Sequence, residues 1–99
     1  MSNKMRPIHP GEVLKDELDE LGFSASAFAK QLAVPVNRVT SILNGTRAVT
    51  ADTALRLACF FGTSAEFWLN LQSSYNLKIT MQQQGKKIRK EVHPHREAA

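Results

Sequence analysis

The stretch Ser24–Gly45, SASAFAKQLAVPVNRVTSILNG, decides the fold of this 99-residue chain. Ser24 is a residue type that caps helix N-termini, and apolar residues recur after it at helical spacing. The segment Ala33-Val34-Pro35 interrupts this pattern, and a second short helix follows until Asn44-Gly45 ends it. We therefore expect two short helices joined by a turn of about three or four residues, with a small residue where they cross. The expected inward positions are Phe28, Ala29, Leu32, Val34, Val39, Ile42 and Leu43.

The outward face of the second helix carries short hydrogen-bonding side chains, where a merely solvated helix more often shows Glu and Lys. Such a pair can lay its second helix in the major groove of DNA, which is about 12 Å wide, while the first helix crosses the backbone. Arg38 is the one long donor on this face and can pair with both acceptors of a guanine. The alternative is a helical hairpin with a polar surface. The residues predicted to contact bases are Val36, Asn37, Arg38, Thr40 and Ser41.

Acidic residues are absent from Leu21 to Ala51, although nine occur in the chain. A surface that lies against phosphate excludes carboxylates in this way. Taken alone, the charge pattern is explained equally well by chance clustering on a solvated surface. If the segment binds DNA, the residues around its two helices are expected to contact the phosphate backbone. These residues are Ser24, Lys30, Asn44, Thr46 and Arg47.

Three further helices are expected around this pair. Proline at the start and glycine just past the end suit a helix over Pro10–Leu21. Thr50 can cap a fourth helix, and Thr63 with Glu66 three residues later predicts a capping box that opens a fifth. No alternating apolar run of strand type occurs, so the expected fold is all-α with five helices. The expected apolar positions are Leu14, Leu18 and Leu21 in the first helix, Ala54, Leu55, Ala58 and Phe61 in the fourth, and Phe67, Trp68 and Leu71 in the fifth.

Charge separates the last residues from the rest of the chain. Six of the 13 Lys and Arg residues but only two of the nine acidic residues lie within 76–99, so the whole net charge of +4 is located there. The segment also has few large apolar residues and contains a Gln run. We expect one domain over residues 1–77 and a short basic C-terminal tail over 78–99, helical for a turn or two and mobile from about Gly85.

The composition excludes several classes of protein. A single cysteine, Cys59, rules out a disulfide framework and a cysteine-based zinc site, and a small buried thiol is its expected state. No signal sequence or membrane span is visible, so a cytoplasmic protein is expected. No Ser-His-Asp set, paired-carboxylate pocket or glycine-rich phosphate loop occurs, so we expect neither an enzyme nor a cofactor. No metal site is expected either, because His9 reads as a helix-capping or packing residue and His93 and His95 have no cluster of Asp, Glu or Cys beside them.

The stretches on both sides of the two-helix unit carry a family resemblance. They are HPGEVLKDELDELGFS over 9–24 and TRAVTADTALRLACFFGTSAEFWLNLQ over 46–72. Over about residues 6–77 the chain resembles the HigA-type antitoxins, also labelled virulence-associated protein I, of the lambda-repressor-like (XRE) helix-turn-helix family. The pairing of HPGE with Glu66-Phe67-Trp68-Leu69 is more specific than the helix-turn-helix alone. The resemblance implies a homodimer that binds double-stranded operator DNA, represses its own operon and neutralises a small RelE-like mRNA-cleaving toxin by complex formation.

The resemblance also implies a dimer interface at the start of the fifth helix. Neighbouring residues point about 100° apart on a helix, so one small domain does not bury both Phe67 and Trp68 equally. Together with Leu71 they are predicted to form an apolar seam across a two-fold axis. The alternative is that one of the two aromatic residues belongs to the core of the single chain.

Three features depart from the family's pattern. Ala33 stands at the turn position usually given to glycine, and Pro35 stands where a Ser or Thr cap is usual. The tail over 78–99 is basic, whereas antitoxin segments that wrap a basic toxin are often acidic, so we do not expect it to bind the toxin. Two alternatives to an antitoxin are a stand-alone transcriptional regulator without a toxin partner and an interaction protein that binds DNA incidentally. A small basic reading frame next to the gene would favour the antitoxin.

Overall fold

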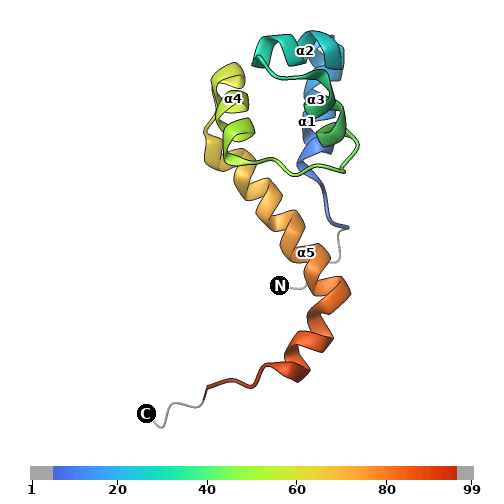
Figure 1. Cartoon of the computed structure of the whole chain (residues 1–99), viewed down its shortest axis with the longest axis vertical. Coiled ribbons are helices and arrows are strands. Elements are labelled where there is room, and N and C mark those ends of the chain that lie inside the picture. Colours follow the sequence, from blue (N-terminus) through green and yellow to red (C-terminus); the bar gives the residue numbers. More distant parts are fainter. Residues whose placement is uncertain (1–5, 96–99) are drawn as a thin grey trace.

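The computed structural model describes residues 6–95, and over that range the chain forms helices and no strand. The helices are α1 (Pro10–Leu21), α2 (Ala25–Leu32), α3 (Val36–Leu43), α4 (Ala51–Phe61) and α5 (Ala65–Glu91). In Figure 1, α1 to α4 gather at one end of the molecule, and the later half of α5 runs away from them. The all-α fold of five helices is thus confirmed. Residues 1–5 and 96–99, the outer ends of the expected domain and tail, lie outside the described residues.

Most helices begin at the residues expected to cap them. Ser24 and Thr50 each accept a backbone N–H of the following turn through the side-chain oxygen. His9 caps α1, because its Nδ1 accepts a hydrogen bond from the N–H of Gly11 at 2.9 Å, and Glu12 completes a capping box. The expected role of His9 as a capping residue is therefore confirmed.

The start of α5 differs from the expectation by one residue. Ser64, not Thr63, caps the helix by accepting the N–H of Phe67 at 3.1 Å, so the expected capping box of Thr63 with Glu66 is wrong. The Oγ1 of Thr63 instead accepts a hydrogen bond from the indole Nε1 of Trp68 at 3.2 Å. This bond satisfies the one polar group of a buried tryptophan.

One apolar core joins the first four helices to the start of α5. Two leucines expected in it are exposed, Leu21 at the end of α1 and Leu55 on α4. Leu57 takes the buried place on α4, while Ala58 and Phe61 are half-buried. Both faces of α4 carry alanine and leucine, so the sequence alone did not determine which face is buried. Packing against the other helices buries the face with Leu57. The core residues are Leu14, Leu18, Phe28, Ala29, Leu32, Val39, Ile42, Val49, Ala54, Leu57 and Trp68.

The helix α5 is longer than the sequence analysis expected. It continues through Gly85 to Glu91. Residues 85–91, which were expected to belong to a mobile tail, are therefore helical. Gln, Lys, Arg and Met, which dominate this part, are good helix formers, and one glycine does not end the helix. Four large apolar side chains on or directly after this part are exposed, namely Leu77, Met81, Ile88 and Val92.

Three further observations bear on the expectations from composition. Cys59 is exposed on α4, not buried as expected. None of the helices within residues 6–95 combines the length and the apolar character that crossing a membrane requires. Over the same range, His, Cys, Asp and Glu side chains do not gather in threes as metal ligands would.

Candidate nucleic-acid interface

The turn between α2 and α3 fixes how these two helices cross. Ala33 has a φ of 57°, in the left-handed region that glycine enters freely and alanine enters at a cost of about 1 kcal/mol. The N–H of Val34 donates to the carbonyl oxygen of Ala29 at 3.0 Å and closes the end of α2. As expected, Pro35 provides no side-chain cap for α3. The crossing is held by buried side chains of both helices, among them Phe28 and Val39.

Gly11 sets the position of α3 against α1. It is buried, and a Cβ at this position would collide with the carbonyl oxygen of Ile42 and lie 2.8 Å from its carbonyl carbon. The ring of His9 supports the same corner by packing edge-on against Tyr75 of α5, with ring centroids 4.9 Å apart. The side of α3 that faces the core is therefore fixed by close contacts from α1, and its other side is left for a ligand.

His9 is held in its neutral form. Burial lowers the pKa of its imidazole below the ordinary value, against the opposite effects of the Glu12 carboxylate and the backbone of Arg47. Protonation would convert Nδ1 from an acceptor into a donor, and the bond from Gly11 would be lost. Glu12 is itself paired with Arg6, Oε1 to Nη2, at 2.7 Å.

Four of the five residues predicted to contact bases lie on the outward side of α3. Val36 is 45% exposed. Asn37 is also exposed, and Thr40 and Ser41 are half-buried. The Oγ1 of Thr40 donates to the carbonyl oxygen of Asn37 at 3.3 Å, which leaves the hydroxyl lone pairs available as acceptors. These four side chains offer donors, acceptors and one apolar group, which match the acceptors, donors and thymine methyl groups that base edges present in the major groove.

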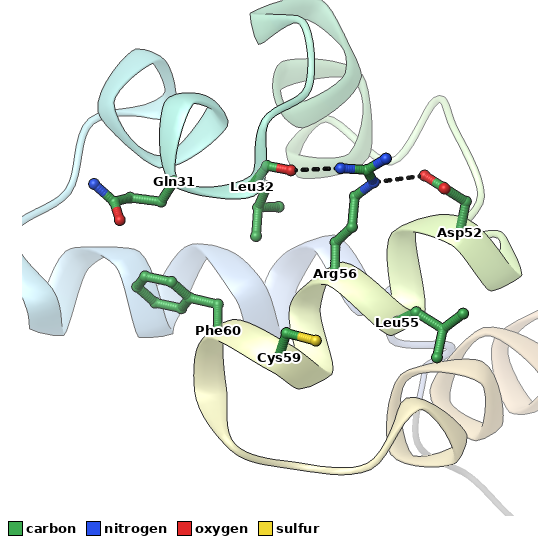
Figure 2. Close-up of a pocket in the computed structure, with 7 residues that line it drawn as sticks. All are labelled: Gln31, Leu32, Asp52, Leu55, Arg56, Cys59 and Phe60. Atoms are coloured by element: carbon green, nitrogen blue, oxygen red, sulfur yellow. Dashed lines mark hydrogen bonds and ion pairs between the residues drawn. The ribbon is translucent and has the colours of Figure 1, made fainter.

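The fifth residue, Arg38, is not free as the sequence analysis assumed. Its side chain is 29% exposed, and its Nη1 donates to Oδ2 of Asp52 at 2.6 Å. The same oxygen accepts Nε of Arg56 at 2.9 Å, and Nη1 of Arg56 donates to the carbonyl oxygen of Leu32 at 2.9 Å (Figure 2). The guanidinium groups of Arg56 and Arg38 hold the pKa of the Asp52 carboxyl below its ordinary value, so it is ionised at neutral pH.

Asp52 and Arg56 are the residues of this surface that sequence reasoning missed. Asp52 is the first acidic residue after the acid-free stretch and precedes Arg56 by four positions on one helix, a spacing that indicates an ion pair. Its bond to Arg38 joins residues 14 positions apart and belonging to different helices. No local pattern signals a contact of that kind.

The residues predicted to contact phosphates are all exposed. The loop that follows α3 is ordered by the last turn of that helix, because the carbonyl oxygen of Ser41 accepts both the Thr46 hydroxyl at 3.1 Å and the N–H of Arg47 at 3.2 Å. The two cations among these residues, Lys30 and Arg47, lie on α2 and in the loop after α3. The five residues are Ser24 and Lys30 at the start and on the surface of α2, and Asn44, Thr46 and Arg47 after α3.

Gln72 of α5, another residue that the sequence analysis did not single out, holds the far end of this loop. Its buried Oε1 accepts the N–H of Val49 at 2.8 Å, and its Nε2 donates to Oδ1 of Asn76 at 3.0 Å. Because Val49 is itself a core residue, the segment carrying Thr46 and Arg47 is fixed at both ends. Val49 and Gln72 lie 23 positions apart, so no sequence pattern indicated their bond.

The three residues predicted for a dimer interface differ in exposure. Trp68 is 2% exposed and packs against Phe61 with ring centroids 5.7 Å apart, so it belongs to the core of the single chain. Phe67 is 44% exposed, and Leu71 is half-buried. The apolar surface available to a partner at this place therefore comes from Phe67 and Leu71, with Trp68 beneath them.

Two crossed helices with a polar, carboxylate-free outward side on the second define a DNA-binding domain of the helix-turn-helix class. Residues 14–68 match the Helix-turn-helix family. The chain is 49% identical over 81 residues to Virulence-associated protein I of Dichelobacter nodosus. This match covers 81% of this chain and 75% of that relative.

Two solved structures are similar over nearly the whole chain. An addiction module antidote protein of a HigA family from Coxiella burnetii is 63% identical with a TM-score of 0.89, and the match covers 92% of this chain and 100% of the other. The antitoxin HigA of Pseudomonas aeruginosa, solved with the higBA promoter, is 47% identical with a TM-score of 0.87, covering 90% and 98%. The chain belongs to the HigA-type antitoxins of the helix-turn-helix family.

Proposed function

We propose that this antitoxin binds, as a homodimer, to operator DNA upstream of its own gene and represses its toxin–antitoxin operon. The observation that carries the proposal is the outward side of α3, where Asn37, Thr40 and Ser41 lie without a carboxylate among them. The contact of Gly11 with Ile42 fixes this helix from the opposite side. The 47% identical HigA, whose structure contains its promoter, supports DNA as the partner.

In this proposal, base recognition and backbone positioning are divided between two sets of side chains. Val36 contacts a thymine methyl group, while Asn37, Arg38, Thr40 and Ser41 form hydrogen bonds to base edges. The second set carries no sequence information and places the domain on the duplex. Its members are Ser24, Lys30, Asn44, Thr46 and Arg47.

The cations of the second set provide a direct test of that division. Lys30→Ala combined with Arg47→Ala should weaken binding to every duplex by a similar factor. It should also reduce the slope of log affinity against log salt by about 2, because two phosphate contacts are lost. Binding titrations over a range of salt concentrations measure both quantities. An unchanged slope would contradict the assignment of these two residues to phosphates.

The proposed dimer follows from the size of an operator. One recognition helix covers a few base pairs, and repressors of this class bind two half-sites about 34–36 Å apart through a two-fold axis. Phe67→Ala should shift the chain toward monomer in sedimentation while helicity is retained, since Phe67 is 44% exposed. A variant that remains fully dimeric would place the two-fold axis elsewhere.

The operator itself is tested with the region directly upstream of the gene. A duplex of that region and a shuffled duplex of the same length and composition are titrated with the protein at one salt concentration. We expect a preference of about a thousandfold or more for the upstream duplex, the range usual for specific binding. Equal affinity for both duplexes would contradict the proposed repression.

We also propose that the chain neutralises a small RelE-like mRNA-cleaving toxin by forming a complex with it. Membership of the HigA-type antitoxins supports this assignment. The adjacent small reading frame is expressed alone and together with this chain. Growth arrest with mRNA cleavage is expected in the first case, and relief with co-purification in the second. Arrest that persists would contradict the proposal, and operator binding without a toxic neighbour would identify a stand-alone regulator.

A further inference from the structure

We propose that Asp52 is a specificity-determining residue of the DNA-binding surface. It holds Arg38 in one orientation on α3 and withholds its guanidinium from the phosphate backbone of unrelated DNA. The inference rests on the proposed function of α3 as the recognition helix. It adds a residue from outside the two-helix unit, at the first turn of α4, that acts through Arg38 and does not itself contact DNA.

The arrangement of three charged side chains carries this inference. Oδ2 of Asp52 accepts Nη1 of Arg38 at 2.6 Å and Nε of Arg56 at 2.9 Å. Arg56 is anchored in turn, because its Nη1 donates to the carbonyl oxygens of Leu32 at 2.9 Å and Ala33 at 3.5 Å. The series of bonds therefore runs from the turn of the two-helix unit, through α4, to Arg38 in the first turn of α3.

Figure 2 shows the part of this series of bonds that links Leu32, Arg56 and Asp52. Arg56 reaches from α4 toward the end of α2 and lies between Leu32 and Asp52. Because Nε of Arg56 bonds to Asp52 and Nη1 bonds to the carbonyl oxygens of the turn, Arg56 fixes the Asp52 carboxylate relative to that turn. Arg38 is then fixed relative to the same turn, so its direction depends on the crossing of α2 and α3 and not on solvent.

The charge pattern gives a reason why this carboxylate is not merely a surface ion pair. Asp52 is the only acidic residue between Leu21 and Ala65, a stretch that contains all the residues proposed to contact DNA. An exposed ion pair contributes little to stability, whereas a carboxylate beside a phosphate-binding surface repels every duplex. Its position next to Arg38 therefore lowers binding to DNA in general, and the oriented guanidinium restores binding where a matching base is present.

The test compares Asp52→Asn with Asp19→Asn, the same chemical change at an exposed site on α1. Affinities for the upstream duplex and the shuffled duplex are measured over a range of salt concentrations, with circular dichroism as the check of folding. In Asp52→Asn, Arg38 is free to reach phosphates. We expect affinity for the shuffled duplex to rise about threefold to tenfold, the salt slope to steepen by about 1, and the preference for the upstream duplex to fall about tenfold. Asp19→Asn should leave the preference unchanged.

The same substitution in an Arg38→Ala background shows whether Asp52 acts through Arg38. There, Asp52→Asn should leave the preference for the upstream duplex unchanged. An unaltered preference in the single Asp52→Asn variant, or an equal fall in both backgrounds, would overturn the inference while the proposed function stands. If the wild-type protein shows no preference for the upstream duplex, the proposed function fails and the inference fails with it.

Discussion

The two parts of α5 lie in different surroundings although they form one continuous helix. The first part, residues 65–75, packs on the other helices, buries Trp68, and provides Tyr75 as the partner of His9. The later part, residues 76–91, which we call the α5 extension, runs away from the other helices (Figure 1). Leu77, at its beginning, is 62% exposed. Tertiary packing therefore stabilises the first part, whereas the extension depends largely on the helix propensity of its own residues.

This difference gives a rule for where substitutions should matter. The packed part contributes buried side chains with specific partners, namely Trp68, which donates to Thr63, and Gln72, which accepts the N–H of Val49. In the extension, by contrast, the large side chains of Leu77, Met81 and Ile88 are exposed. Matched substitutions in the two parts should therefore differ in the size, and in one case in the sign, of their effect on stability.

The largest expected effect is at Trp68. Trp68→Ala should lower the free energy of unfolding by about 3–5 kcal/mol, because it empties a core position and removes the bond to Thr63. Leu77→Ala in the extension should change it by less than about 0.5 kcal/mol in the monomer. Urea unfolding monitored by circular dichroism measures both. Similar losses in the two variants would show that the extension is packed as tightly as the core.

A pair of glycines should give effects of opposite sign. Gly11→Ala should destabilise the fold by about 2–3 kcal/mol, since its Cβ meets the backbone of Ile42. Gly85→Ala should stabilise α5 by about 1 kcal/mol, because the new Cβ lies at an ordinary 3.7 Å from the nearest atom of Arg89. Thermal unfolding reports the first change and helix content the second. A neutral Gly11→Ala would mean that α1 and α3 separate easily. A less helical Gly85→Ala would show that the added Cβ does not fit beside Arg89 and Met81.

In the turn between α2 and α3, one substitution should raise the stability of the protein. Ala33→Gly should raise the free energy of unfolding by about 0.5–1 kcal/mol, because the backbone at φ 57° is strained for alanine. Ala27→Gly, inside α2, serves as the control and should lower stability by about 1 kcal/mol. If Ala33→Gly lowers the stability as much as Ala27→Gly does, residue 33 does not occupy the left-handed conformation in solution.

The smallest effect is the pH dependence contributed by His9. Its pKa is lowered in the folded chain, so the unfolded chain takes up the proton more readily. The contribution of His9 is fully present above about pH 6.5, and it decreases as the pH falls below that value. His9→Asn keeps an oxygen acceptor for capping but does not titrate, so the difference between the two proteins isolates the effect. Parallel stability curves from pH 8 to pH 5 would contradict the neutral, buried His9.

Features encoded in neighbouring residues were predictable from the sequence. The starts of α1, α2 and α4 follow from the local caps His9, Ser24 and Thr50. The ends of α1 and α4 follow from Gly22 and Gly62, both of which adopt the left-handed conformation. The end of α5 was not predictable from its single glycine, because good helix formers on both sides of Gly85 carry the helix onward. Leu55 was expected in the core in place of Leu57, because the rotation of α4 depends on packing against other helices.

In the candidate site, too, local features were predictable and contacts between distant residues were not. The outward residues of α3 were predictable, because the acid-free stretch and the helical period are local properties of the sequence. Two contacts that shape the surface were not, namely Arg38 with Asp52 and Val49 with Gln72, which join residues 14 and 23 positions apart. Trp68 was assigned to a dimer seam from the family resemblance and from its position next to Phe67, with a place in the core as the alternative. Its burial in the single chain depends on packing against Phe61 of α4, which no local pattern indicates.

The proposed function assigns recognition of the operator sequence to α3, and none of the proposed contacts lies on the basic α5 extension. The most direct measurement is the ratio of affinities for the upstream and shuffled duplexes in two double variants. Asn37→Ala with Thr40→Ala should reduce the ratio about tenfold or more, since base contacts are lost. Lys86→Ala with Lys87→Ala should leave it unchanged, because any contact of these lysines with DNA would be to phosphate. An unchanged ratio in the α3 variant, or a larger fall in the extension variant, would contradict the account.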